Sequence, residues 1–374
     1  MRLEKRSSMI NYKSLLIGSL LVFILNAGLF PESEYIVIKN PVPNLKEKNF
    51  VQLKKVGEIV DEIAKGVFLF YPVSMAMDLR HNLYVYDSMQ AKILVFDPSF
   101  KYISSLGGGV GNGPGEFMGT GQGFVVDLSI GLDGKLYAHD ERAFKILVFD
   151  TEKLKYDRDI KYEPGLESGF SSFFAPVVDK EGNFIMQKYQ DGQLIVFNNK
   201  GKILLSLPHK EKKREILFIE NKMAPPPKGL SAPIEPFYYS PFDLVLNYTS
   251  RSELLVYFAL SGTLYVVPQK GKAQHFRIWP EMALEDLKKS VKGIDYGYAR
   301  MFDPVFLDGD NDEFFLLKGG GTKTIRRIYK INLKGELISV FIAPVINNEP
   351  PRFMLKKNNY FIAKHSEKIL IYKE

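Results

Sequence analysis

One pattern of residues recurs along the chain and constrains the fold more than any other feature. The stretch from Asn82 reads NLYVYDSMQAKILVFD, and the stretch from Lys135 reads KLYAHDERAFKILVFD. The two align without a gap and share the whole of KILVFD. Four more divergent copies begin at Asn183, Glu253, Glu313 and Asn359. Six copies of one unit predict a repeat architecture.

Each copy reads as four short β-strands. In the first copy we expect strands at residues 73–78, 83–86, 93–96 and 102–106. These runs are apolar or alternating and are bounded by Gly, Asn, Asp and Pro. The 28 Phe and 20 Tyr also favour strands. Four antiparallel strands recurring every ~45–70 residues are typical of propeller blades, so we predict an all-β, six-bladed β-propeller with four-stranded antiparallel blades. A β-sandwich would not repeat the same four-strand unit six times.

The last copy lacks one strand. It offers three expected strands, at residues 353–356, 360–363 and 369–372, after which the sequence stops. The segment 50–59 (FVQLKKVGEI) lies ahead of the first copy and reads as an unpaired strand. We expect this N-terminal strand to pair with the last blade and close the ring, since a free strand would leave two unpaired edges.

The beginning of the sequence has the layout of a secretory signal. Four basic residues precede an apolar run over residues 15–25, and Asn26-Ala27-Gly28 supplies small residues after it. The run is shorter than the ~20 residues that span a bilayer. We expect residues 1–27 to be a signal peptide or, alternatively, a retained membrane anchor, with the protein periplasmic or secreted. Residues 28–49 are then a linker and residues 50–374 the propeller, with insertions at 209–237 and 280–300.

Charge and cysteine content exclude several classes of function. The net charge is +7, and the predicted leader holds four basic residues and one acid, so its removal leaves about +4. That excess is spread along the chain, whereas a nucleic-acid-binding protein needs a clustered basic stripe. The chain has no Cys, which excludes disulfides, a thiol nucleophile and thiolate metal sites. We expect a monomer that binds no nucleic acid.

A glycine-rich segment lies between the first two copies and reads LGGGVGNGPGEF from Leu106 to Phe117. Its glycines do not have the spacing of a phosphate-binding loop, and no Lys-Ser/Thr follows. Together with the blade pattern, this segment resembles the NHL-repeat and related six-bladed propeller family. The resemblance is strongest over residues 72–150. It implies a surface that recognises proteins or other polymers, although some relatives with this fold are metal-dependent lactonases or lyases.

Blades of four strands place all blade-to-blade connections on one face of the ring, together with the turns between second and third strands. We call this the connection face. The irregular segments 107–121, 161–172, 209–237 and 280–300 all fall there. Because function concentrates in loops held by a rigid scaffold, we predict a non-enzymatic scaffold that binds a protein, peptide or glycan on this face. The candidate ligand-binding residues are Phe117, His139, Arg142, Lys188, Lys364 and His365.

A metal-dependent lactonase or lyase acting at the channel mouth is the alternative. It would hold calcium or zinc through Asp87, Asp127, Asp140 and His139. A catalytic zinc needs three protein ligands, whereas only His139 and His365 of the five histidines could share a face. Calcium needs six to eight oxygens, and an Asp at the end of a second strand often caps the following turn. We therefore expect no cofactor and no catalytic residues. A structural subunit of an envelope assembly is a third possibility.

Overall fold

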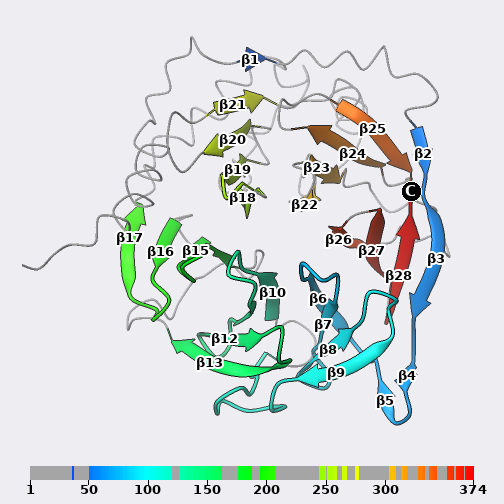
Figure 1. Ribbon diagram of the computed structural model, residues 1–374, viewed down its shortest axis with the longest axis vertical. Helices are drawn as coiled ribbons and strands as arrows, with labels where there is room; N and C mark the ends of the chain where they lie inside the picture. Colours follow the sequence, from blue (N-terminus) through cyan, green and yellow to red (C-terminus); the bar gives the residue numbers. More distant parts are fainter. Residues whose placement is uncertain are drawn as a thin grey trace, which may run out of the picture.

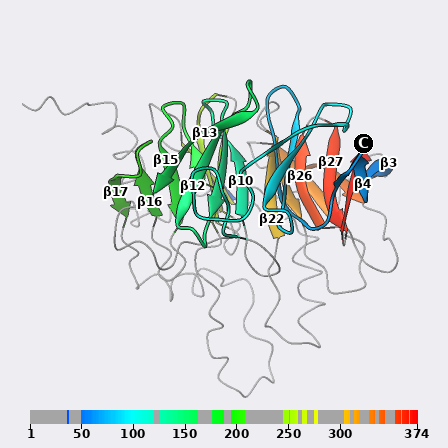
Figure 2. The same cartoon turned by 90° about the horizontal axis from the view of Figure 1, so that it is seen from below.

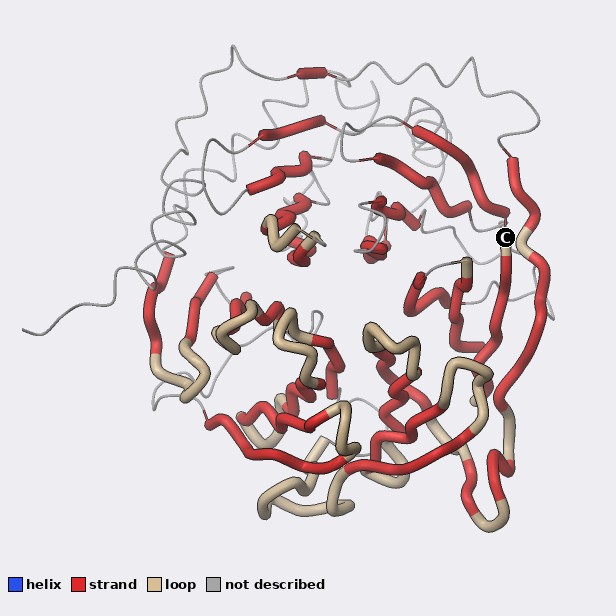
Figure 3. Tube along the Cα trace, viewed as in Figure 1, coloured by secondary structure: helices blue, strands red, loops and turns tan. Residues whose placement is uncertain are grey.

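The chain forms a ring of small sheets around a central axis (Figure 1). This computed structural model describes the following residues: 36–37, 50–119, 126–161, 176–187, 194–207, 244–249, 251–258, 263–267, 274–277, 303–308, 313–317, 327–332, 337–342, 352–357, 359–365 and 367–374. The predicted leader, the insertions 209–237 and 280–300, and Lys188 lie outside these residues. Within them the chain forms strands and loops but no helix (Figure 3), and therefore no helix long and apolar enough to cross a membrane.

Each copy of the repeat forms one blade, and the blades are numbered in chain order. Blade 1 consists of β6 (Pro72–Met77), β7 (Leu83–Asp87), β8 (Lys92–Phe96) and β9 (Tyr102–Leu106). Blade 2 consists of β10 (Val126–Ile130), β11 (Leu136–Asp140), β12 (Lys145–Asp150) and β13 (Lys155–Lys161). Blade 3 consists of β14 (Val177–Val178), β15 (Phe184–Gln187), β16 (Leu194–Phe197) and β17 (Ile203–Leu207).

The second half of the ring repeats this order. Blade 4 consists of β18 (Leu244–Tyr248), β19 (Leu254–Phe258), β20 (Thr263–Val267) and β21 (Gln274–Arg277). Blade 5 consists of β22 (Asp303–Asp308), β23 (Glu313–Leu317), β24 (Arg327–Asn332) and β25 (Leu337–Ile342). Blade 6 begins with β26 (Arg352–Lys357), β27 (Tyr360–His365) and β28 (Lys368–Lys373). The first strands of successive blades are neighbours all the way round, and β26 returns to β6. The predicted six-bladed propeller is confirmed.

An N-terminal strand closes the ring, as the sequence predicts. β3 (Lys54–Ile59) pairs antiparallel with β28, with Ile59 opposite Ile369, and so completes blade 6. A short hairpin of β4 (Glu62–Ala64) and β5 (Val67–Phe68) then leads into β6. Ile59 packs in one apolar cluster with Leu83 and Ile371, which joins blade 6 to blade 1. The closing strand therefore supplies both backbone hydrogen bonds and core side chains.

The segment 50–59 does not all belong to blade 6, which corrects the prediction of a single strand there. β2 (Phe50–Gln52) pairs in parallel with β25 as a fifth strand of blade 5. β1 (Ile36–Val37), within the expected linker, likewise pairs in parallel with β21 of blade 4. β1 and β2 thus cover the outer edges of blades 4 and 5 (Figure 1), and β3 completes blade 6. Pairing satisfies backbone groups that an open sheet edge would leave exposed.

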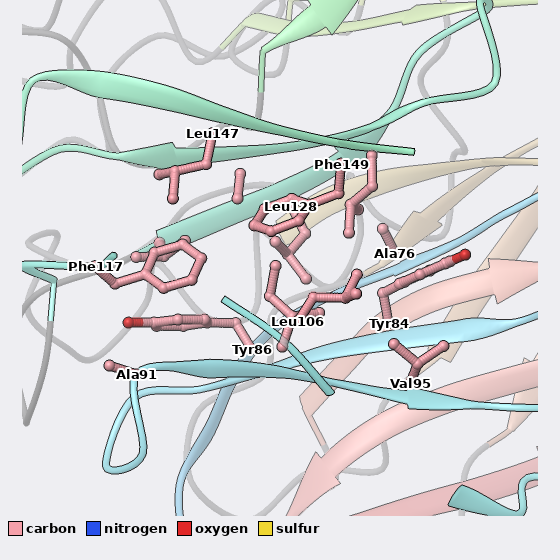
Figure 4. Packing of buried hydrophobic residues seen from close by; sticks show 14 residues of the cluster. Ala76, Tyr84, Tyr86, Ala91, Val95, Leu106, Phe117, Leu128, Leu147 and Phe149 are labelled. Carbon is pink, nitrogen blue, oxygen red and sulfur yellow. The ribbon is translucent and has the colours of Figure 1, made fainter. Parts of the chain in front are cut away.

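The core between blades 1 and 2 is built around the glycine-rich segment. Phe117 is fully buried, with its ring 4.9 Å from that of Tyr86 and 6.3 Å from that of Phe149 (Figure 4). The buried ammonium of Lys145 donates to the Gly113 carbonyl oxygen at 2.9 Å and lies 3.2 Å from the Asp159 carboxylate. These contacts fold the segment against blade 2. Gly107 has φ +98°, and a Cβ there would lie 2.5 Å from Cε2 of Phe117.

The glycine at position 107 can be tested against a matched position. Gly109 also has a positive φ, of +93°, but a Cβ added there would meet no atom within 4 Å. We expect Gly109→Ala to lower the free energy of unfolding by about 1–2 kcal/mol through backbone strain alone. Gly107→Ala should lower it by roughly 1–3 kcal/mol more because it also displaces the Phe117 ring. Urea unfolding of both variants measures the difference, and equal losses would contradict this packing role.

Candidate functional site

The connection face carries the turns between second and third strands and the glycine-rich segment. In Figure 2 the blades are seen edge-on, with their strands running between the two faces of the ring. On blade 1 the turn joins β7 to β8, and on blade 2 it joins β11 to β12. The sequence-predicted site residues of these two blades lie in or beside these turns, so their surroundings decide what this face can bind.

Asp87 and Asp140 end the second strands of blades 1 and 2 and are fully buried. Asp87 accepts hydrogen bonds from the backbone N–H of Phe70 at 2.6 Å and of Met89 at 3.0 Å. Asp140 accepts hydrogen bonds from the backbone N–H of Met118 at 2.6 Å and from the next turn. Each carboxylate therefore joins its own turn to the segment that leads into the same blade. Of the two roles expected for these aspartates, turn capping and metal binding, these contacts correspond to turn capping.

His139 and Asp127 stand directly opposite each other on β11 and β10. The equivalent pair in blade 1 is Tyr86 and Ser74, and the Tyr86 hydroxyl donates to the Gly119 carbonyl oxygen at 2.7 Å. His139 thus occupies a position whose blade 1 counterpart links neighbouring blades. It is almost completely buried, and this burial lowers its pKa to about 4. The imidazole is therefore neutral at pH 7.

The remaining candidate residues differ in exposure. Phe117 lies in the core, so its side chain contacts no ligand on the connection face, contrary to the sequence expectation. Arg142 is exposed in the turn after Asp140. Lys364 is the penultimate residue of β27 in blade 6 and is half-buried, with its ammonium 3.9 Å from the centre of the Tyr71 ring. His365 follows it and is also half-buried. The structure thus leaves Arg142 exposed on this face and buries His139 and Phe117.

This face also carries five exposed apolar side chains that are not among the residues predicted from the sequence. Their exposed fractions lie between 40 and 68%. They are Phe68, Phe70, Met89, Val110 and Phe144. The rings of the first two stack with 5.8 Å between their centres. Only burial in the folded chain distinguishes these residues from the many core aromatics, so composition could not have identified them.

Phe144 also has an unusual backbone conformation. Its φ is +50°, in the left-handed region, where a bulky side chain is disfavoured. The equivalent residue of blade 1 is Ala91, with φ +52°, and the aligned copies display this difference in the sequence. A large, strained and exposed aromatic residue on a rigid turn is a candidate for contact with a ligand.

The candidate metal ligands do not form a cluster that could hold a metal ion. Among the residues that the structure describes, no group of three or more His, Asp or Glu side chains converges in that way. His139 and Asp140 are consecutive on one strand, so their side chains point to opposite faces of the blade. Of the four candidate metal ligands, only Asp127 and His139 are cross-strand partners.

Comparison with known proteins agrees with the fold. A family model, DUF5128, described as a 6-bladed beta-propeller, matches residues 65–227. The chain is a six-bladed β-propeller, and the part of it that matches this family model is residues 65–227. No curated protein matches the sequence.

Solved structures with similar folds have low sequence identity to this propeller. A member of the duf4221 family from Bacteroides vulgatus has 8% identity and a TM-score of 0.52, over 87% of this chain and 98% of that one. A Bacteroides fragilis protein described as exported has 13% identity and a TM-score of 0.48, over 87% and 99%. Virginiamycin B lyase from Staphylococcus aureus has 10% identity and a TM-score of 0.45, over 86% and 99%. At 8% identity, the likeness to the duf4221 structure shows the fold and not the function.

The burial of His139 predicts a pH-dependent stability. The pKa of the folded form, about 4, lies below the ~6.5 of an unfolded histidine. As the pH falls from about 6.5 to 4, the unfolded chain takes up a proton that the folded chain does not, so stability falls by roughly 3 kcal/mol and then levels off. Carboxylates titrate in the same range, so the measured quantity is the difference from His139→Gln. Blade 3 carries Gln187 at this position. If the free energy of unfolding depends on pH in the same way for the wild-type protein and His139→Gln, the prediction is wrong.

Proposed function

We propose that the protein is an exported, non-enzymatic propeller that binds a protein, peptide or glycan through its connection face. The observation that carries this proposal is the distribution of exposed apolar side chains. Five large ones lie on the connection face of blades 1 and 2 and the segment leading into blade 1. Among the described residues, Leu79 is the one strongly exposed counterpart in the turns of the opposite face, and the other four exposed apolar side chains lie on the fourth strands at the rim.

This asymmetry favours binding over chance exposure. Single exposed apolar residues are ordinary on protein surfaces, whereas several in neighbouring loops of one face are typical of an interaction surface. Aromatic side chains are also enriched at the energetic centres of interfaces, as is arginine. Phe144 and Arg142 belong to the same turn. Together they supply an apolar surface and a charged group that suit a peptide or the face of a sugar ring.

The rigidity of the scaffold supports the same function. The turns on blades 1 and 2 are fixed by Asp87 and Asp140, which bind backbone N–H groups on both sides. Side chains held on such turns lose little conformational entropy when a ligand binds. The secretory layout of residues 1–27 supports export.

Phe144→Gly separates a binding role from a structural one. Gly adopts a positive φ without strain, so we expect the free energy of unfolding to stay equal or rise by about 1 kcal/mol. Ligands selected on the wild-type protein from a displayed peptide library and a glycan array should bind the variant at least ~10-fold more weakly.

Leu79→Ser provides the matched control, because it removes an exposed apolar side chain from the opposite face. It should leave the affinity for the same ligands unchanged. Ligands that tolerate Phe144→Gly but are lost with Leu79→Ser would move the binding surface to the other face and refute the proposal.

A further inference from the structure

The fourth strands of the blades share an irregularity that the sequence did not reveal. In blades 1, 2, 3, 5 and 6 the pairing of third and fourth strands shifts by one residue at the same place. The extra residues are Ile103, Asp157, Leu204, Ile338 and Val56. The four apolar ones are exposed by 39 to 54%. Such β-bulges bend an edge strand and hinder its pairing with another chain.

The residues after the bulge nevertheless accept an added strand in blade 5. There β2 pairs in parallel with Val340–Ile342, starting two residues beyond Ile338, and Leu53 N–H donates to the Ile342 carbonyl oxygen at 3.0 Å. In blade 4, β1 pairs in parallel with Phe276 and Arg277, again at the end of the fourth strand. The fold therefore has a repeated docking position on its rim, and in this chain short uncharged segments occupy it twice.

Blade 1 offers the same position without an occupant among the described residues. Ser104 and Ser339 are each the first residue after the bulge, so Ser105 and Leu106 correspond to Val340 and Phe341. Of the strands that the structure describes, none pairs with the outer edge of β9. Ser105 is exposed, and β9 contains no charged residue. Figure 1 shows β9 as the outermost strand of its blade.

Among the described strands, two other open edges of the ring carry charges, whereas β17 of blade 3, which reads ILLSL, is uncharged like β9. β13 of blade 2 reads KYDRDIK, and β3 of blade 6 reads KKVGEI. Charged residues on an edge strand discourage pairing with another chain. β9, which reads YISSL, has no such protection beyond its bulge.

We propose that the outer edge of β9 at Ser105 and Leu106 binds an extended, uncharged segment of a partner protein, which adds as a parallel strand. The chemistry of the occupant follows from β1 and β2, which are uncharged, extended and parallel at the equivalent positions. Backbone hydrogen bonds would supply affinity, as in other cases of strand addition. This site is a backbone edge and not the exposed side chains of the connection-face loops, so a failed test of strand addition would leave the proposed function unaffected.

The absence of cysteine from the chain permits a direct test by disulfide trapping on the full-length chain carrying Ser105→Cys. The probe is a synthetic peptide with the sequence of residues 49–53, with blocked ends, in which Phe50 is replaced by Cys. Phe50 lies directly opposite Val340, so the two thiols should meet if the peptide docks on β9 in the same register. The matched control is Glu58→Cys. Gly57 is the first residue after the bulge of β3, so Glu58 occupies the position of Ser105 on a charged edge.

In a buffer of oxidised and reduced glutathione, which supplies the disulfide for exchange, we expect the peptide to form a disulfide with Ser105→Cys about tenfold faster than with Glu58→Cys, and a scrambled peptide to show no such preference. Adding Ser104→Lys to Ser105→Cys should remove the preference, because a lysine protects an edge. Both cysteine variants change exposed side chains, and equal urea midpoints would verify that they fold. Equal trapping rates at the two edges would overturn the proposal. Disulfide-linked dimers of Ser105→Cys that form in preference to the peptide adduct would also overturn it, because they would assign the edge to a second copy of the chain.

Discussion

Pairing between the two ends of the described chain holds the ring together. β3 joins β28, and its Ile59 packs with side chains of both blade 6 and blade 1. Without this strand, blade 6 would expose an edge and the core between blades 6 and 1 would lose one wall. The loops of the connection face depend on this closure, because the hairpin that carries Phe68 and the segment that carries Phe70 lie directly between β3 and β6.

Several residues whose types suggest chemistry serve the architecture. Asp87 and Asp140 bind backbone N–H groups, and Lys145 binds a carbonyl oxygen of the glycine-rich segment. Burial makes such contacts strong and leaves an unsatisfied polar group costly, so the propeller uses charged groups to fix its turns. The surface available for binding is then formed by side chains with no catalytic chemistry, chiefly Phe70, Met89 and Phe144.

A feature of this fold can be predicted from the sequence when the interactions that produce it join residues close together in the chain. The strands of blade 1 were predicted to within a residue or so, because alternation and turn residues are local signals. The irregular loop around Phe117 predicts a binding surface, but the Phe117 ring packs between blades 1 and 2. Burial of that kind depends on the neighbouring blade and has no local signature. The docking of β2 on blade 5 was missed for the same reason, since strand addition involves residues nearly 300 positions apart.

The sequence by itself determined the blade, the number of blades and the strand that closes the ring, because six repeated units must bury their faces against each other and an incomplete last unit needs a partner. Only the tertiary structure decided which side chains remain available. It buried His139 and Phe117, left Phe144 exposed in a left-handed turn, and covered the rims of blades 4 and 5 but no part of β9 among the described residues. These outcomes depend on contacts between distant segments, which repetition along the sequence does not encode.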